Sequence, residues 1–188
     1  MTNALLERAL QDLQRWHRNG HLIYLSVNIS PQHLEQPALA EFTRHLLKKY
    51  DIPANYLRFE VTENGLMRDH ESAVETMLSL SFLGVQLALD DFGTGYSSLK
   101  YLKELPIDGI KIDRSFVQDI CIDNSDETII EAMLSMANSL GMYCIAEGVE
   151  TEQQLAFFSR RQCYLIQGFL FAKPMTQVQL SDYLLQEH

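Results

Sequence analysis

Hydrophobic and polar positions along this chain follow two alternating patterns, one with the spacing of a helix and one of short apolar runs. Apolar residues three or four positions apart predict an amphipathic helix, whereas a short apolar run bounded by polar residues predicts a buried strand. The predicted strands cover residues 22–28, 57–61, 85–89, 110–112, 143–146 and 163–166. The predicted helices cover about residues 5–16, 31–49, 67–82, 97–105, 124–140, 151–160 and 176–186.

Six strands separated by helices, without a linker rich in proline, glycine or serine, predict an α/β fold with a parallel sheet. Two architectures share this order of elements, the doubly wound sheet and the (β/α)8 barrel. The chain has 188 residues, 46% of them apolar, so we expect one domain over residues 1–188 with a sizeable core. The same composition excludes a wholly disordered chain.

Charged and amide residues lie at or just beyond the carboxyl ends of the predicted strands. A doubly wound sheet gathers its ligands mainly at one switch point, whereas a barrel brings the carboxyl ends of all its strands to one rim. The pattern therefore favours a TIM-like (β/α) barrel with a site at that rim. The candidate residues are Asn28, Glu60, Glu63, Asp90, Asp91, Lys111, Glu147, Glu150 and Gln167.

Carboxylates gathered at one rim repel one another and raise one another's pKa unless cations neutralise them. Carboxylate and amide oxygens suit Mg²⁺ or Mn²⁺. The neighbours Asp90 and Asp91 can face two different ions, and a pair of metal ions is the usual arrangement for attack on a phosphodiester. A lysine such as Lys111 can hold the attacking water or stabilise charge on the phosphate. The rim therefore predicts hydrolysis of phosphate esters.

Charge and cysteine content limit the kinds of ligand and the cellular compartment that we expect. The formal net charge of −10 argues against binding to a nucleic-acid polymer, because phosphate backbones select basic surfaces. The three cysteines, Cys121, Cys144 and Cys163, have neither disulfide nor zinc spacing, so we expect buried thiols in a reducing cytoplasm. No apolar run approaches the roughly 20 residues of a membrane span, so we expect no membrane insertion.

The ordered motifs resemble the EAL family of cyclic di-GMP phosphodiesterases. The resemblance runs from about Val27 to Met175 and implies a TIM-like barrel that uses two divalent metal ions, Mg²⁺ or Mn²⁺. The implied reaction converts cyclic di-GMP, a bacterial second messenger, to linear pGpG. The motifs are Val-Asn-Ile-Ser from 27, Phe-Glu-Val-Thr-Glu from 59, Asp-Asp-Phe-Gly-Thr-Gly-Tyr-Ser-Ser-Leu from 90, Ile-Lys-Ile-Asp from 110, Ala-Glu-Gly-Val-Glu-Thr from 146 and Gln-Gly-Phe-Leu-Phe-Ala-Lys-Pro from 167.

The resemblance also implies roles for the candidate residues. Family metal ligands are matched by Asn28, Glu60 and Asp90, and the ligand of the second metal by Asp91. Lys111 matches the lysine that positions the water, and Glu147 matches a carboxylate assigned to metal binding or general-base work. Glu150 and Gln167 match positions near the metals and the substrate. Glu63 matches the glutamate that anchors the loop after Asp91, where family dimers form.

Purely structural roles, without a part in catalysis or metal binding, remain open for the same residues. Asn28 can satisfy a turn, and Lys111 can be a lysine that simply pairs with Asp90. Glu63 and Glu150 can serve the dipole at the start of a helix. If Lys111 positions the water, Lys111→Ala is expected to abolish hydrolysis and to leave folding almost intact.

One departure from the family concerns its Glu-Ala-Leu triplet, which has no counterpart here. We therefore expect an incomplete barrel with about six strands, truncated at its N-terminus. A second copy of the chain, or the N-terminal segment or sensor domain of a longer protein, is expected to complete it. Two functions stay open, a phosphodiesterase and a non-catalytic module that binds cyclic di-GMP or docks a partner.

Overall fold

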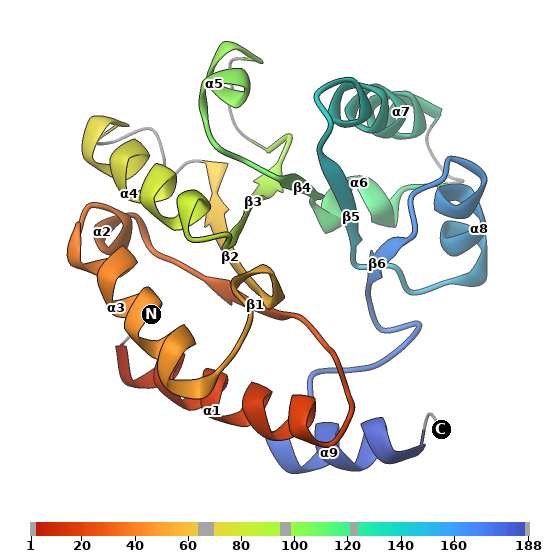
Figure 1. Cartoon of the computed structure of the whole chain (residues 1–188). Coiled ribbons are helices and arrows are strands. Elements are labelled where there is room, and N and C mark those ends of the chain that lie inside the picture. Colours follow the sequence, from red (N-terminus) through yellow and green to blue (C-terminus); the bar gives the residue numbers. More distant parts are fainter. Residues whose placement is uncertain (1–2, 64–69, 95–98, 121–123, 187–188) are drawn as a thin grey trace. The chain divides into compact units, whose positions relative to one another are not determined.

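A computed structural model describes residues 3–63, 70–94, 99–120 and 124–186 of the chain (Figure 1). The strands are β1 (Leu25–Asn28), β2 (Leu57–Thr62), β3 (Gln86–Phe92), β4 (Gly109–Ile112), β5 (Tyr143–Glu147) and β6 (Leu165–Gln167). The helices are α1 (Asn3–Arg18), α2 (Pro31–Leu34), α3 (Ala38–Tyr50), the 3-10 helix η1 (Ala54–Tyr56), α4 (His70–Phe82), α5 (Leu99–Glu104), α6 (Arg114–Gln118), α7 (Asn124–Ser139), α8 (Glu152–Arg160) and α9 (Gln177–Gln186).

The strand order in the sheet is β1-β2-β3-β4-β5-β6, the order in which the strands follow one another along the chain. The described pairs β1–β2, β3–β4, β4–β5 and β5–β6 are parallel. A doubly wound sheet reverses its strand order at a switch point, and this order contains no reversal. The prediction of a TIM-like (β/α) arrangement with six strands is confirmed.

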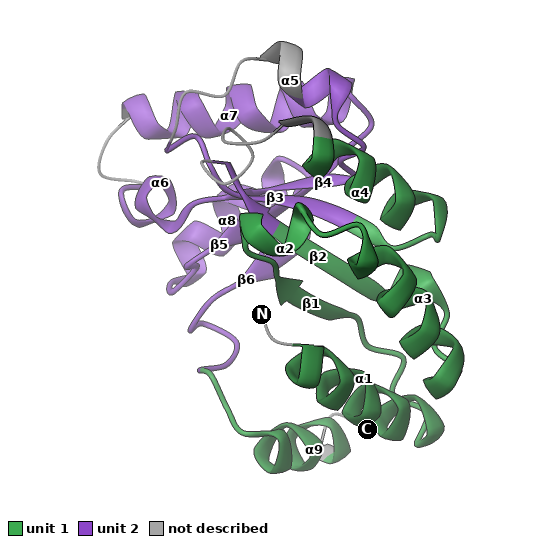
Figure 2. Cartoon of the chain, turned by 90° about the vertical axis from the view of Figure 1, so that its left-hand side faces the viewer, with its two compact units in different colours: residues 1–60, 69–86, 174–188 green, residues 61–68, 87–173 purple. Residues whose placement is uncertain are grey.

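The chain divides into two compact units (Figure 2). The first unit contains residues 1–60, 69–86 and 174–188, and so holds β1 and the first part of β2. In it, α1 packs against α3 and β1. Leu6, Leu10 and Leu13 are fully buried because their spacing puts them on one face of α1. Trp16 Nε1 donates a hydrogen bond of 3.0 Å to Ser181 Oγ, which joins α1 to α9.

The second unit contains residues 61–68 and 87–173 and so holds β4, β5, β6 and nearly all of β3. Every residue of β4 is buried, as expected for a parallel strand covered on both faces. Helix α7 packs against β4 and β5, and α6 packs against β5 and α7. This unit carries most of the predicted site residues. The single domain over residues 1–188 stays a prediction.

Several element boundaries differ from the sequence prediction. The first strand begins at Leu25 and not at Leu22, and it is partly exposed because β1 is an edge strand. The helix predicted over 31–49 is two helices, α2 and α3, because Pro37 lacks a backbone N–H and disfavours a helical residue before it. The last strand is Leu165–Gln167, which begins two residues and ends one residue later than predicted. No helix in the described part of the chain is long and apolar enough to cross a membrane.

Candidate functional site

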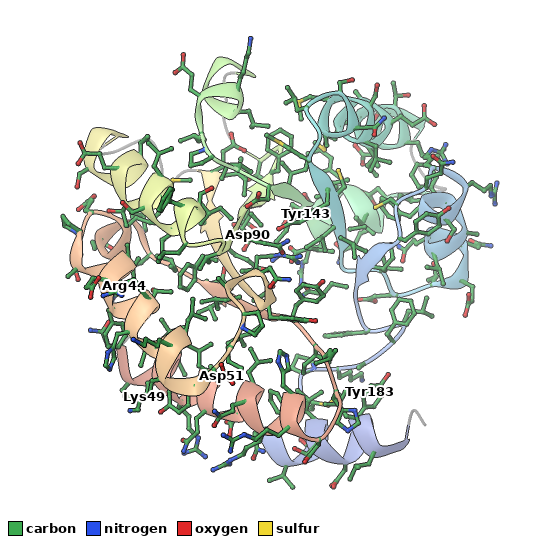
Figure 3. The ribbon with its side chains drawn as sticks, viewed as in Figure 1. Arg44, Lys49, Asp51, Asp90, Tyr143 and Tyr183 are labelled. Carbon is green, nitrogen blue, oxygen red and sulfur yellow. The ribbon has the colours of Figure 1, made fainter. Side chains whose placement is uncertain are left out.

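A lysine lies between two carboxylates at the carboxyl ends of three strands of the second unit. Lys111 Nζ is 3.0 Å from Asp90 Oδ1 and 2.6 Å from Glu147 Oε1. Asp90 is on β3 (labelled in Figure 3), Lys111 is on β4 and Glu147 ends β5. Lys111 is only 3% exposed, so both ion pairs form in a site that largely excludes water.

Asp91 joins this cluster because the backbone of β3 is irregular there. Adjacent residues of a regular strand point to opposite faces of the sheet. The β3–β4 register shifts between Leu89 and Phe92, and Asp91 has a left-handed φ of 55°. Such a bulge re-aims a side chain. As a result, carboxylate oxygens of Asp90, Asp91 and Glu147 lie within 4.8 Å of one another.

The electrostatics of this cluster favour a cation. Burial, followed by the charges of Asp90 and Asp113, raises the pKa of the Asp91 carboxyl, and the Lys111 ammonium opposes this shift. The Lys111 ammonium pairs with the carboxylates of Asp90 and Glu147, and the Asp91 carboxylate lies beside these two. Oxygen ligands with excess negative charge suit Mg²⁺ or Mn²⁺, so the residues fit the predicted metal ions. Among the described residues, Asp90, Asp91 and Glu147 form a group that could hold one such ion.

The loop after β3 is fixed by a buried glutamate. Glu63 is 3% exposed, and its Oε2 accepts a hydrogen bond of 3.2 Å from the Gly93 N–H. Thr94 Oγ1 donates to the Asp91 carbonyl over 2.8 Å. Gly93 has a φ of 98°, and a Cβ there would lie 2.9 Å from the ring carbon Cε2 of Phe116, so the turn favours glycine. This geometry is consistent with the loop-anchoring role predicted for Glu63. Residues 95–98 of the predicted dimer loop lie outside the described residues.

Asn28 and Glu60 form a second group, in the first unit. They are register partners, Asn28 as the last residue of β1 and Glu60 within β2. Glu60 is buried, whereas Asn28 is exposed. The register therefore puts these two predicted ligands side by side on neighbouring strands, and their metal-binding role stays a prediction.

Glu150 and Gln167 contribute their backbones to the turns beside β5. Gln167 is the register partner of Glu147, and its carbonyl accepts a hydrogen bond of 3.1 Å from Val149 N. Both side chains are exposed. Their predicted contacts with metals or substrate stay predictions.

The sequence pattern did not identify the roles of two residues in the segments that follow β4 and β5. Asp113 caps α6 by accepting a hydrogen bond of 3.0 Å from Ser115 N, and its charge acts on Asp91. Gln154 forms a capping box with Thr151 at the start of α8. The local signals were present, since aspartate is a preferred residue at the N-cap of a helix, and threonine followed by glutamine three residues later is typical of a capping box.

A cavity of about 650 Å³ lies at the other end of the strands, where β5 and β6 begin. Its lining includes Cys144, Cys163 and Arg161, and Arg161 is already paired with Glu131. Cys163 is buried and Cys144 half-buried, and both are free thiols as predicted, while Cys121 lies outside the described residues. Burial raises the pKa of Cys144 to about 12 and that of Cys163 to about 11, so neither is a nucleophile at neutral pH.

Comparison with known proteins gives the same family as the sequence motifs. The model of the EAL domain family matches residues 1–174. The cyclic di-GMP phosphodiesterase NbdA of Pseudomonas aeruginosa is 42% identical over 181 residues, which are 96% of this chain and 23% of NbdA. The bifunctional diguanylate cyclase/cyclic di-GMP phosphodiesterase MucR of the same species is 38% identical over 94% of this chain and 26% of MucR. The chain thus spans about a quarter of the length of these relatives.

Solved structures show the same fold. A complex of the MucR phosphodiesterase with c-di-GMP superposes with a TM-score of 0.88 at 37% identity, covering 95% of this chain and 72% of that one. A manganese and cyclic di-GMP complex of BlrP1 from Klebsiella pneumoniae superposes with a TM-score of 0.85 at 28% identity, covering 93% of this chain and 44% of that one.

Proposed function

Because this chain belongs to the EAL domain family, we propose that it hydrolyses cyclic di-GMP to linear pGpG with the help of two divalent metal ions, Mg²⁺ or Mn²⁺. The observation that carries the proposal is the position of Lys111 between Asp90 and Glu147, with Asp91 beside them. Hydrolysis needs a group that orients water among negatively charged oxygens. A buried lysine held by two carboxylates has the charge and rigidity for this role.

The proposed reaction assigns a task to each residue. Asp90, Asp91 and Glu147 would hold a metal ion, and Asn28 and Glu60 are the other proposed ligands. Ions bound there would supply a water of lowered pKa and positive charge to neutralise the phosphate. Lys111 orients the attacking water, and Glu147 is the candidate general base that accepts its proton. Attack on phosphorus breaks the P–O3′ bond, the 3′ oxygen takes up the proton that Glu147 accepted from the water, and the ring opens to pGpG. Glu150 and Gln167 support the site, and Glu63 anchors the loop after β3.

Binding without hydrolysis is the second candidate function. It is supported by the similarity of the fold to a solved structure in complex with c-di-GMP. The chain would then bind cyclic di-GMP or dock a partner. In either case we propose that a second copy of the chain or an N-terminal segment completes the barrel, and that the protein acts in the cytoplasm, where cyclic di-GMP is made.

The test is to incubate the purified chain with cyclic di-GMP and Mn²⁺ and to measure both nucleotide binding and pGpG formation. The proposal expects pGpG that disappears when EDTA removes the metal, and that is absent with Lys111→Met. Binding without product would refute the enzyme and support the binding module. A folded chain that neither binds nor hydrolyses cyclic di-GMP would refute both functions.

A further inference from the structure

Gln154 holds the loop that follows β5, residues 148–151, by its side chain. The side chain is nearly buried, at 7% exposure. Its Oε1 accepts a hydrogen bond of 2.8 Å from Glu150 N and one of 3.0 Å from Thr151 N. The bond from Thr151 belongs to the capping box, but the bond from Glu150 reaches one residue further back, toward Glu147. Gln154 therefore fixes the loop itself as well as the start of the helix.

The other end of the same amide is attached to α6. Gln154 Nε2 donates a buried hydrogen bond of 3.0 Å to the carbonyl of Val117. Helix α6 begins directly after β4, the strand of Lys111. The loop also passes close to α6 at Gly148, where an added Cβ would lie 2.6 Å from Arg114 Cβ. One side chain thus connects the loop after Glu147 to the helix after Lys111.

We propose that Gln154 is a positioning residue, which sets the place of Glu147 relative to Lys111 and, through Glu150, the shape of the loop beside the metal site. The inference rests on the proposed function, because it assumes that Glu147 is a metal ligand. Groups that orient metal ligands by hydrogen bonds raise metal affinity by about 10–100-fold. A role in capping alone would stabilise the helix and leave metal affinity unchanged.

The test compares three variants of the full chain. Gln154→Met keeps the length of the side chain and removes its hydrogen bonds. Thr151→Val removes the other half of the capping box, the 3.3 Å bond from Gln154 N to Thr151 Oγ1, and keeps the Oε1 contact with Glu150 N. Gln153→Met is the matched control, since Gln153 is the exposed neighbour on the same helix. Mn²⁺ affinity is measured by electron paramagnetic resonance of the free ion, and Tm by circular dichroism.

The proposal expects Gln154→Met to weaken Mn²⁺ binding about tenfold, with Thr151→Val and Gln153→Met binding as the unsubstituted chain does. Where pGpG is formed, the Mn²⁺ concentration for half-maximal activity should shift by the same factor. Equal Mn²⁺ affinity in Gln154→Met, with a Tm lowered as in Thr151→Val, would overturn the proposal and leave only a cap. Tight Mn²⁺ binding without pGpG would refute the proposed enzyme activity. The difference in Mn²⁺ affinity between Gln154→Met and the two other variants would then still test the positioning role of Gln154. If the unsubstituted chain binds no Mn²⁺, both the proposed metal-dependent function and the positioning role of Gln154 are refuted.

Discussion

Replacing Lys111 by methionine should destabilise the chain when no metal is present, besides removing any hydrolysis. Methionine keeps most of the aliphatic length but removes the ammonium that lies 3.0 Å from Asp90 and 2.6 Å from Glu147. Two carboxylates are then left in a largely buried site without that cation. This differs from the sequence-based expectation that folding stays almost intact after Lys111→Ala, because the sequence did not show that Lys111 is held by two acids.

The size of the effect follows from burial. Removing one partner of a buried ion pair costs about 3–5 kcal/mol. The Asp90 and Glu147 side chains keep 12% and 16% of their exposure, so water stabilises them in part. We therefore expect the free energy of unfolding to fall by about 3 kcal/mol, at the lower end of that range. For a chain of this size that corresponds to a Tm lower by about 6–12 °C.

Urea unfolding at pH 7 in EDTA, followed by circular dichroism, measures this difference. Lys103→Met is the matched control, because Lys103 is exposed on α5 and its replacement should change stability by less than about 0.5 kcal/mol. Saturating Mn²⁺ should reduce the difference in free energy of unfolding between Lys111→Met and the unsubstituted chain, since a bound cation replaces the lost positive charge. A Lys111→Met chain that unfolds at the same urea concentration as Lys103→Met would refute the counter-ion role.

Three further predictions concern the same unit. Asp91→Asn should raise stability at pH 7 in EDTA and should abolish hydrolysis: burial and the neighbouring acids raise the folded pKa of Asp91 above 3.8, so stability is lost as pH rises through that window. Asparagine also accepts the left-handed φ. The gain in free energy of unfolding, measured with urea, should vanish below pH 3.8, where the carboxyl is protonated in both states. A gain that persists there would contradict this electrostatic origin. Gly93→Ala should lower the free energy of unfolding by about 1–3 kcal/mol, because the φ of 98° strains alanine, and an unchanged urea midpoint would contradict it. Cys144 and Cys163, with pKa values raised to about 12 and about 11, should resist iodoacetamide at pH 8 until urea unfolds the chain, as peptide mass spectrometry would show; fast labelling of the folded chain would contradict their burial.

The sequence by itself determined the order of elements and most of the candidate residues. Strand and helix periods are local properties, so the six strands could be located from the spacing of apolar residues. Because the carboxyl ends of parallel strands meet at one edge, the polar residues that follow the strands could be grouped from their positions in the sequence. This is how Asp90, Lys111 and Glu147 were placed together.

Tertiary structure decided how these residues meet. The irregular backbone at Asp91 turns two adjacent carboxylates toward Glu147, and a register shift between strands has no signature in the spacing of apolar residues. The link from Gln154 to Val117 joins residues 37 positions apart, so no local pattern contains it. Local periodicity follows from backbone geometry that each segment carries with it, whereas the partners of a buried polar group are set only when distant segments pack.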